Sequence, residues 1–384
     1  MARGSSFDVV VIGAGVFGAW TAWYLAKRRQ RVLLLEMHGP AHSRASSGGE
    51  SRIIRMSYGA DEIYTRWSKN SLTEWKALFA EPRERLFHET GVLWLGAQGS
   101  AYLEQSRVSL QLCGVKHEVL QHGDLEKRYP QMNFEGVAHG LLEPESGVLL
   151  ARRAVNCAVE SALRMGAVLR IAKVLTPRGS GRLDSIETTA GERIAAGNFV
   201  FACGPWLGKV FPELLGPRVF PTRQEVFFFG TPPGDERFAP PALPTWFFQS
   251  DEVYGMPDIE SRGLKLACDV HGERVDPDTQ SRLVSREGAE WATQYVARRF
   301  PGMKGAPIVE TRVCQYENTS SGDFLIDRHP EFSNVWLVGG GSGHGFKHGP
   351  ALGEHVAGLV LGEQIPERRF SLAAKATEQK RAVH

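Results

Sequence analysis

Three features of the sequence predict an α/β protein with a Rossmann-like dinucleotide-binding domain and an inserted domain built on a mixed or antiparallel sheet. They are a strand–glycine–helix–strand unit at the start, an aromatic run of strands in the middle and a second glycine-rich turn near the end. The expected nucleotide-binding domain is discontinuous and comprises residues 1–90, 150–218 and 320–384. Residues 91–149 and 219–319 form the expected substrate domain.

The first unit spans Phe7–Glu36 and predicts a strand, a helix and a second strand. Val9–Ile12 is a short β-branched run, which is typical of a strand buried on both faces. A helix is expected over Ala19–Lys27, and a second strand over Arg31–Leu35. These elements follow one another within about thirty residues, so they form the context that a dinucleotide-binding motif needs.

Three glycines and one acid of this unit predict contacts with a dinucleotide. Gly13, Gly15 and Gly18 have G-x-G-x-x-G spacing, which allows a tight turn, a close approach of pyrophosphate and close helix–strand packing. The phosphates would lie at the helix N-terminus, where unpaired N–H groups favour negative charge. Glu36 can accept hydrogen bonds from an adenosine ribose, which argues against NADP and leaves NAD and FAD open.

Composition excludes several classes of function. The 384 residues are 42% hydrophobic and 23% charged, with a formal net charge of +2, which is ordinary for a globular protein. This charge gives no reason to expect nucleic acid, and no apolar run is long enough to span a bilayer, so neither is an expected partner. The first strand follows closely on Met1–Ser6, so no signal peptide is expected, and Arg381–His384 is not a peroxisomal signal. The cytoplasm is the expected location.

The five cysteines do not form a recognisable framework. They are odd in number, widely spaced and without a C-x-x-C pair, so neither disulfides nor a metal site is expected. Four of them are predicted to be small buried hydrophobes, namely Cys113, Cys157, Cys203 and Cys268. The fifth, Cys314, lies in a motif of its own.

The loop over residues 38–51 is polar and rich in small side chains, which suits a loop that lies against a cofactor. It leads into Ser51–Tyr58, where Arg52 and Arg55 flank two isoleucines. Buried guanidinium groups need anionic partners. We therefore expect a functional role for at least one of these arginines.

The middle of the chain changes from alternating elements to a sheet. Helices are expected over Glu62–Ala80, Ala101–Leu112, Gly123–Tyr129 and Arg152–Met165. Strands are expected over Gly91–Gly96, Ala167–Ile171, Leu183–Thr189, Arg193–Ala195 and Asn198–Cys203. From residue 219 to about 313, strand-like runs separated by proline-rich turns predict an antiparallel sheet with a helix over Arg286–Arg299. The runs are Val226–Phe229, Thr245–Phe248 and Gly263–Leu266. Trp246–Phe248 would give a pocket an aromatic wall if alternate residues face it.

The last part returns to the nucleotide-binding pattern. Val335–Val338 predicts a strand, Gly339–Lys347 a glycine-rich turn and Pro350–Leu361 a helix. NAD dehydrogenases seldom end on a second glycine-rich loop of this kind. FAD has a long ribityl chain to accommodate, so the sequence favours FAD.

These motifs together resemble the monomeric sarcosine oxidase, N-methyltryptophan oxidase and pipecolate oxidase family, within the D-amino-acid oxidase-like FAD superfamily. The resemblance covers nearly the whole chain. It rests on Gly13–Glu36, Ser51–Arg55 with Tyr58, Gly263–Lys265, Val313–Tyr316, Asp327–Pro330 and Gly341–Lys347. It implies an FAD-dependent oxidase that converts the C–N bond of a secondary-amine amino acid (N-methyl, N-substituted or cyclic) to an imine and reduces O2 to hydrogen peroxide.

The resemblance implies how the cofactor is held. The second glycine-rich turn supplies further cofactor-binding residues, namely Gly341, Gly343, Gly345 and Lys347. In the family the cysteine that matches Cys314 forms a thioether to the flavin, so covalent FAD is implied. Taken alone, Cys314 would be an ordinary buried cysteine, although the neighbouring cation Arg312 would favour its thiolate.

The resemblance also implies roles for four cations. Arg55 and Lys347 match a clamp for the substrate carboxylate, and two cations, one with a bidentate fork, suit that task. Lys265 matches the lysine that activates oxygen, and Arg52 an arginine close to the flavin; these two are the predicted catalytic residues. Taken alone, the pattern leaves open that this lysine, between two leucines in a strand, points outward.

Three further residues match positions that line the substrate pocket: Tyr254, Tyr316 and His344. For Tyr254, simple packing is the alternative. Two positions depart from the family, because Gly48 and Asp269 stand where relatives have histidine. An acid in the pocket would repel a carboxylate and attract an ammonium or a second basic group, which leaves the amino acid itself open.

Two other functions are considered. One is an FAD-dependent dehydrogenase that passes electrons to a quinone or carrier protein, against which Cys314 and Lys265 argue. The other is a non-catalytic flavin-binding partner protein, which the set of Arg55, Lys347 and Lys265 disfavours. The expected partners are a small amino acid and O2, and a monomer is expected, although the residues leave the oligomeric state open.

Overall fold

A seven-stranded sheet forms one half of the structure, which is a computed structural model that describes residues 7–80 and 84–378. Its strands are β1 (Phe7–Ile12), β2 (Val32–Glu36), β9 (Val168–Ile171), β10 (Ser185–Glu187), β11 (Arg193–Phe201), β17 (Leu325–Arg328) and β18 (Val335–Gly339). The order is β17-β18-β11-β1-β2-β9, with β10 paired to β11. β18, β11, β1, β2 and β9 are parallel, and β10 and β17 join antiparallel. This is the expected Rossmann-like arrangement.

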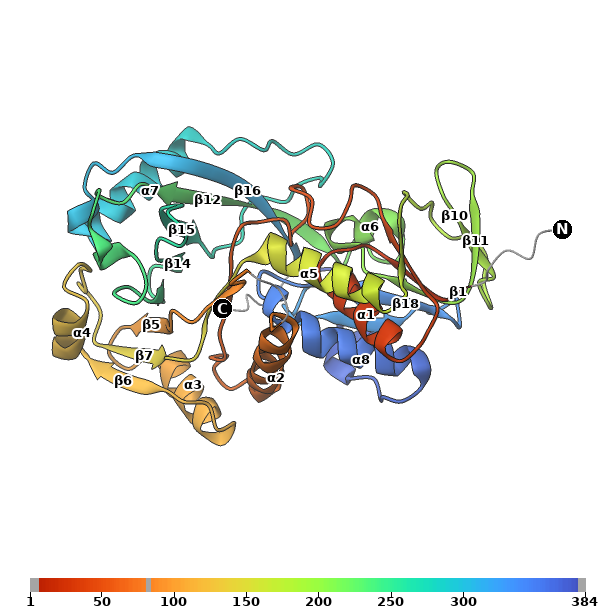
Figure 1. Ribbon diagram of the computed structural model, residues 1–384, viewed down its shortest axis with the longest axis horizontal. Coiled ribbons are helices and arrows are strands. Elements are labelled where there is room, and N and C mark those ends of the chain that lie inside the picture. The colour runs from red at the N-terminus through yellow and green to blue at the C-terminus, as the bar shows by residue number, and fades with distance from the viewer. Residues whose placement is uncertain (1–6, 81–83, 379–384) are drawn as a thin grey trace.

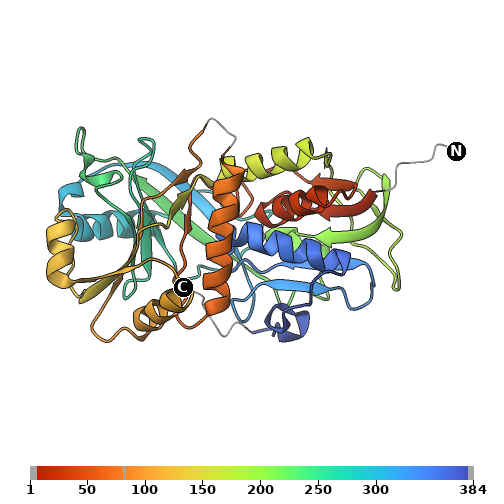
Figure 2. The ribbon, with the colours of Figure 1, turned by 60° about the horizontal axis from the view of Figure 1, so that its bottom comes forward.

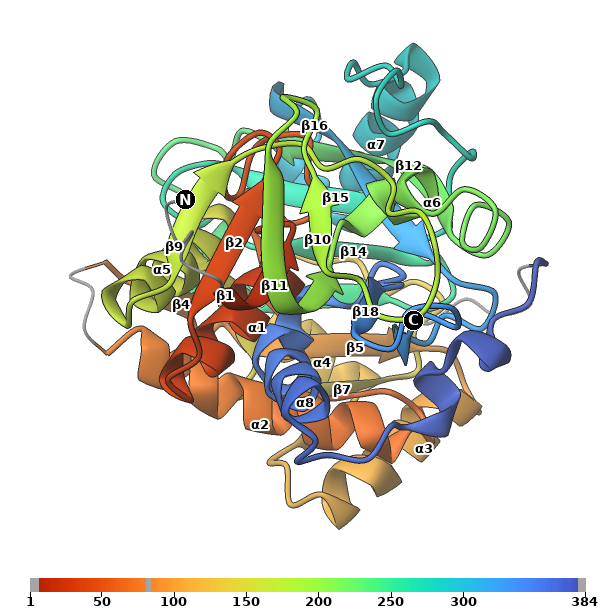
Figure 3. The same cartoon turned by 90° about the vertical axis from the view of Figure 1, so that its right-hand side faces the viewer.

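Three helices lie side by side on one face of this sheet: α1 (Val16–Lys27), α5 (Ala151–Arg164) and α8 (Gly349–Leu361) (Figures 2 and 3). Val9 and Val11 of β1 pack in the core that contains these helices, whereas Val10 and Ile12 pack in a core on the opposite face. β1 is therefore buried on both faces, as its apolar run predicts.

An eight-stranded sheet forms the other half of the molecule (Figure 1). Its strands are β5 (Val92–Gly96), β6 (Glu118–Gln121), β7 (His139–Glu143), β12 (Phe220–Phe229), β13 (Thr245–Phe248), β14 (Val253–Met256), β15 (Leu264–Cys268) and β16 (Ile308–Asn318). The order is β16-β12-β15-β14-β13-β5-β7-β6. Only the β13–β5 pair is parallel among these neighbours, so the sheet is mixed.

The two faces of this sheet have different neighbours. The flanking helices are α3 (Ala101–Leu112), α4 (His122–Arg128) and α7 (Arg286–Arg299). Trp246 and Phe248 of β13 pack in the core that includes residues of α7, whereas Phe247 between them faces the other half of the molecule. Because side chains alternate along β13, only Phe247 of these three aromatic residues lies on the side that lines the expected substrate pocket.

β12 and β16 are longer than the sequence predicts. They pair from Phe220↔Asn318 to Phe229↔Ile308 and reach from the second sheet toward the first (Figure 1). Polar residues continue the pairing, since Asn318 Nδ2 donates to Thr222 Oγ1 at 2.9 Å. Hydrophobic periodicity does not detect such a polar ladder, and Cys314 lies within it, on β16.

Smaller elements connect the two halves. α2 (Glu62–Leu78) stands between them (Figure 2). A three-stranded sheet contains β3 (Arg52–Ile54), β8 (Gly147–Leu149) and β4 (Phe87–His88) in that order. The short elements are α6 (Leu207–Val210), η1 (Gly204–Trp206), η2 (Glu236–Phe238), η3 (Pro301–Met303), η4 (Phe346–His348), η5 (Arg368–Phe370) and η6 (Leu372–Ala374). Across the two described ranges, no helix combines the length and apolarity needed to cross a membrane.

Candidate active site

The turn after β1 requires glycine for steric reasons. Gly13 has φ of 105°, a conformation that side chains disfavour. A Cβ on Gly18 would lie 1.8 Å from the Gly13 carbonyl oxygen. At Gly15, which caps α1, the only neighbour a Cβ would meet is Ser47 Oγ at 3.5 Å. The helix N-terminus is therefore open to a ligand, and its unpaired N–H groups favour an anion.

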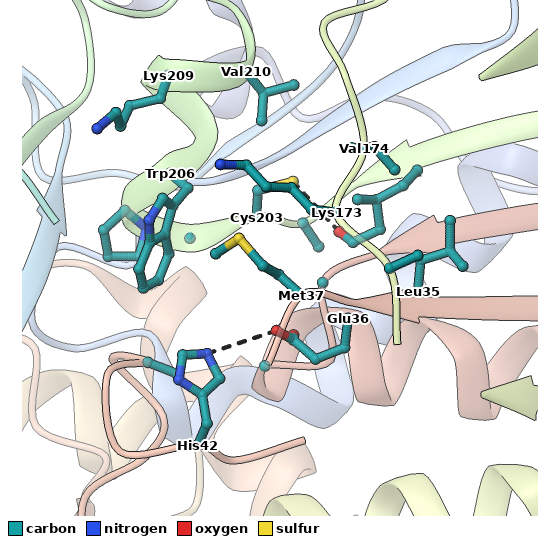
Figure 4. A pocket seen from close by; sticks show the side chains of 18 of the residues that line it. Leu35, Glu36, Met37, His42, Lys173, Val174, Cys203, Trp206, Lys209 and Val210 are labelled. Carbon is teal, nitrogen blue, oxygen red and sulfur yellow. Dashed lines mark hydrogen bonds and ion pairs between the residues drawn. The ribbon is translucent and has the colours of Figure 1, made fainter. Parts of the chain in front are cut away.

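Glu36 lies in a cavity of about 320 Å³ at the end of β2 (Figure 4). Its Oε2 accepts a hydrogen bond from Ala14 N at 2.8 Å, and its Oε1 accepts one from His38 N at 3.1 Å. Burial and nearby cations lower the pKa of His42 to about 4. The 3.6 Å contact between His42 Nε2 and Glu36 Oε1 therefore does not neutralise the carboxylate at neutral pH.

A second cavity continues from the first and shares Gly15, Ser46 and Ser47 with it. The second glycine-rich turn forms its other wall. A Cβ on Gly345 would approach the Phe17 ring to 2.7 Å, and one on Gly343 would approach the Tyr316 ring to 2.8 Å. The turn is thus packed closely enough to require glycine at both positions.

Arg52, which lines both this cavity and a third one, contacts Cys314. Arg52 Nη2 lies 3.1 Å from Cys314 Sγ, and its other contacts are the carbonyl oxygens of Ser51 and Ser46, at 2.8 and 2.7 Å. Although burial opposes its charge, the neighbouring Cys314 and tyrosines raise the pKa of Arg52. The cation beside Cys314 is therefore Arg52.

The expectation that Arg312 approaches Cys314 is wrong. Arg312 Nη2 donates to Glu50 Oε1 and its Nε donates to Glu310 Oε1, both at 2.8 Å. These two carboxylates draw the guanidinium away from the thiol.

The two residues of the expected clamp are both buried. Arg55 is 8% exposed; its guanidinium carbon lies 4.3 Å from the Tyr58 ring centre, and Nη1 donates to the Ser57 carbonyl oxygen. Lys347 Nζ donates to Tyr58 Oη at 2.7 Å and to His344 O at 2.9 Å. Burial, together with Arg55, lowers the pKa of Lys347 well below its usual value.

The third cavity brings the predicted substrate-binding residues together. Arg55 and Lys347 line it with Arg52, Tyr254, Tyr316, His344, Phe247 and Asp269. Tyr316 Oη donates to Asp269 Oδ1 at 3.3 Å, so the acid lies on the wall of the cavity. Burial raises the pKa of Tyr254 to about 12, so its hydroxyl stays protonated at neutral pH.

Lys265 lines a different cavity, of about 310 Å³, with Ser51, Glu50 and Met256. It is 2% exposed, and its Nζ donates to Ser51 O at 2.9 Å and to Ser51 Oγ at 3.2 Å. The alternative that this lysine points outward is therefore wrong. Burial and the charge of Arg52 lower its pKa well below the usual value.

Comparison with known proteins assigns the chain to a family. A family model described as FAD dependent oxidoreductase (DAO) matches residues 8–359. The chain belongs to this FAD-dependent oxidoreductase family. Monomeric sarcosine oxidase from Bacillus sp. (strain NS-129) is 31% identical over 362 residues, which are 92% of each chain. N-methyl-L-tryptophan oxidase from Salmonella heidelberg (strain SL476) is 31% identical over 364 residues, covering 93% of this chain and 95% of the relative.

A solved structure shares the fold. The L-proline dehydrogenase from P. horikoshii aligns with a TM-score of 0.82 at 21% identity, over 96% of this chain and 97% of that one. The predicted α/β fold and the FAD family are therefore confirmed.

The cavities of this family member fit FAD. Glu36 would hold the adenosine ribose, and the N-terminus of α1 would hold the pyrophosphate. The second cavity lies between Phe17 and the glycines of the second turn and has room for an extended chain. Side chains at these glycines would fill that room. The flavin would then lie where Arg52 and Tyr316 border both the second and the third cavity.

Sequence reasoning assigned no role to three residues that support the clamp. Tyr58 Oη bonds Lys347 Nζ and also contacts His348 Nε2 at 2.8 Å. Tyr58 lies in the motif that carries Arg55, and His348 follows Lys347, so their positions were an available signal. Glu143 accepts hydrogen bonds from Met56 N at 2.7 Å and Ser57 N at 3.0 Å. Nothing in the sequence around Glu143 indicates this contact.

Proposed function

We propose that this protein is an FAD-dependent oxidase of secondary-amine amino acids, with an N-methyl, N-substituted or cyclic amine, that forms an imine and releases hydrogen peroxide. The main observation in support of this proposal is a pair of buried cations, Arg55 and Lys347, in one cavity. A third buried cation, Lys265, lies in another cavity. Bound FAD would accept two electrons from the C–N bond and pass them to O2.

Arg55 and Lys347 are the proposed carboxylate clamp. Among the described residues, the hydrogen bonds of these two cations go to uncharged oxygens, namely Ser57 O for Arg55, and Tyr58 Oη and His344 O for Lys347. The ring centres of Tyr58 and Trp94 lie 4.3 and 4.8 Å from the Arg55 guanidinium carbon, and these rings fix the plane of the guanidinium group. Fixing the carboxylate orients the amine and its C–H group, which contributes much of the rate.

Lys265 and Arg52 are the proposed catalytic residues. A preorganised cation stabilises negative charge that develops on oxygen. Burial disfavours the charge of Lys265, so an anion nearby would be expected to favour its protonated form. Because Lys265 does not line the cavity of the clamp, substrate and oxygen would use different cations.

We also propose Cys314 as the covalent attachment point of FAD. Its contact with Arg52, which itself lines both cavities, supports this role. Tyr254, Tyr316 and His344 would shape the substrate pocket, and Gly341, Gly343 and Gly345 would contact the cofactor.

We propose that the protein is a monomer, which is supported by the relative that is itself named monomeric. The cytoplasm is its proposed location. Light scattering that gives 42.4 kDa per particle would support the monomer. A multiple of that mass would contradict it.

The test is to mix the purified yellow protein with N-methyl, N-substituted and cyclic amino acids and measure flavin bleaching without air and peroxide release with air. The oxidase predicts bleaching and one peroxide per amine oxidised. Bleaching that reverses slowly in air, with rapid transfer to a quinone, would favour the dehydrogenase. No bleaching with any amino acid, while FAD stays bound, would favour a binding partner.

A further inference from the structure

Glu317 is a buried acid at the cofactor site that sequence reasoning did not include. It lies near the end of β16 and is 5% exposed. It lines the second cavity with Gly15, Phe17 and Gly341. Its Oε1 has no hydrogen-bond partner among the described residues. An enclosed, unpartnered oxygen of this kind is costly for a carboxylate, and the residue that carries it borders a ligand cavity.

The surrounding backbone is shaped around this carboxyl group. A Cβ on Gly339, the last residue of β18, would lie 2.3 Å from Glu317 Oε1. Ser342 N donates to the Glu317 carbonyl oxygen at 2.9 Å, which ties β16 to the second glycine-rich turn. The side chain is therefore held between β18 and the turn that would contact FAD.

The environment of Glu317 favours its neutral form. Burial raises the pKa of Glu317 to about 8, while the N–H groups of Gly340 and Gly341 act in the opposite direction. The nearby titratable groups are Cys203 at the end of β11, the Tyr316 hydroxyl and, across the same cavity, the Arg52 guanidinium. At neutral pH most molecules therefore carry the carboxylic acid, which has an O–H donor.

The protonation state determines what this group can do for FAD. A carboxylate would face the phosphates with a like charge and no donor. A carboxylic acid can donate to a phosphate or ribityl oxygen and still accept from the backbone.

We propose that Glu317, in its acid form, donates a hydrogen bond to an oxygen of the ribityl–pyrophosphate segment of FAD. The N–H groups of Gly340 and Gly341 then support its other oxygen. This inference rests on FAD as the cofactor, which the family match shows, and not on the identity of the amino acid.

The test measures FAD release from the full-length holoprotein in a Cys314→Ala background, so that the flavin can dissociate. The fluorescence of free flavin after dilution reports the dissociation constant between about pH 6.5 and about pH 9.5. The parent is expected to lose affinity at least about threefold as the pH rises through 8. Glu317→Gln keeps a donor and is expected to retain the low-pH affinity without this decline. Glu317→Ala is expected to bind about three- to tenfold more weakly at low pH, also without a decline.

A control is Glu290→Gln, which changes an exposed acid on α7 outside this cavity and should leave FAD release and its pH dependence unchanged. The proposal is overturned if the parent affinity is constant or rises with pH, or if Glu317→Gln weakens binding as much as Glu317→Ala. If the alanine variant does not fold, the parent and glutamine profiles alone decide between these outcomes.

Discussion

Substitution of Arg55 by lysine tests the carboxylate clamp most directly. The guanidinium carbon lies 4.3 Å from the Tyr58 ring centre and 4.8 Å from that of Trp94, and the side chain is buried. Lysine keeps the charge but has no planar fork, so a substrate carboxylate loses one of two parallel hydrogen bonds.

The expected magnitude follows from these contacts. A hydrogen bond to a charged group contributes about 1.5–3 kcal/mol. A desolvated cation–π contact contributes about 2 kcal/mol, of which an ammonium retains part. Arg55→Lys should therefore lose about 2–3 kcal/mol of transition-state stabilisation, or about 30- to 150-fold in kcat/KM.

The assay separates the two half-reactions. Anaerobic stopped-flow reduction gives the substrate dissociation constant and limiting rate, and mixing the reduced protein with O2 gives the reoxidation rate. We expect the loss only in the first measurement. Arg286→Lys is a control, because the Arg286 side chain is 87% exposed and its ion pair with Glu290 lies at the surface, where such pairs contribute little. A loss below about threefold for Arg55→Lys, or an equal loss with a secondary amine that lacks a carboxylate, would refute the clamp.

Four further substitutions test the rest of the site. Lys265→Met should slow reoxidation about a hundredfold or more and spare anaerobic reduction; an equal fall in both rates would exclude its oxygen role. Cys314→Ala should move the yellow colour from the acid-precipitated pellet to the supernatant, whereas colour already in the supernatant of the parent would mean non-covalent FAD. Asp269→Asn should lower kcat/KM about five- to tenfold for substrates with a second cation and raise it for iminodiacetate, and a uniform change would refute an electrostatic role. Lys347 should take up a proton when a carboxylate inhibitor binds, because burial lowers its pKa in the empty site, so affinity should fall as pH rises; this slope should vanish in Lys347→Met.

The sequence predicted the parts of the site that act locally. Gly13 and Glu36 belong to one short strand–helix–strand unit, in which residue spacing alone determines the geometry. The structure places both residues in the lining of one cavity. Arg55 and Lys347 come from opposite ends of the chain, and only the family resemblance predicted that they act together on the substrate carboxylate. Hydrophobic pattern could not show whether Lys265 points inward, because a strand offers both faces.

Other features depend on distant partners and have no local signature. The sequence predicted Arg312 as the cation beside Cys314, but Arg52 contacts the sulfur, and Arg312 pairs with Glu50 and Glu310. A buried acid next to a glycine-rich turn, such as Glu317, is not distinguishable in sequence from an exposed one. Its role depends on the backbone that folds around it.

The four basic side chains of the site donate hydrogen bonds to backbone carbonyl oxygens, although burial lowers the pKa of Lys265 and Lys347 well below the usual value. Ser51 O accepts from both Arg52 Nη1 and Lys265 Nζ, Ser57 O accepts from Arg55, and His344 O accepts from Lys347. Carbonyl dipoles offset part of the desolvation cost of a buried cation without cancelling its charge, whereas a carboxylate partner would cancel it. One of these carbonyls, that of Ser57, belongs to the segment after β3, which Glu143 holds through Met56 N and Ser57 N. The acid that stabilises this region therefore binds the backbone and leaves the cations to the substrate and to oxygen.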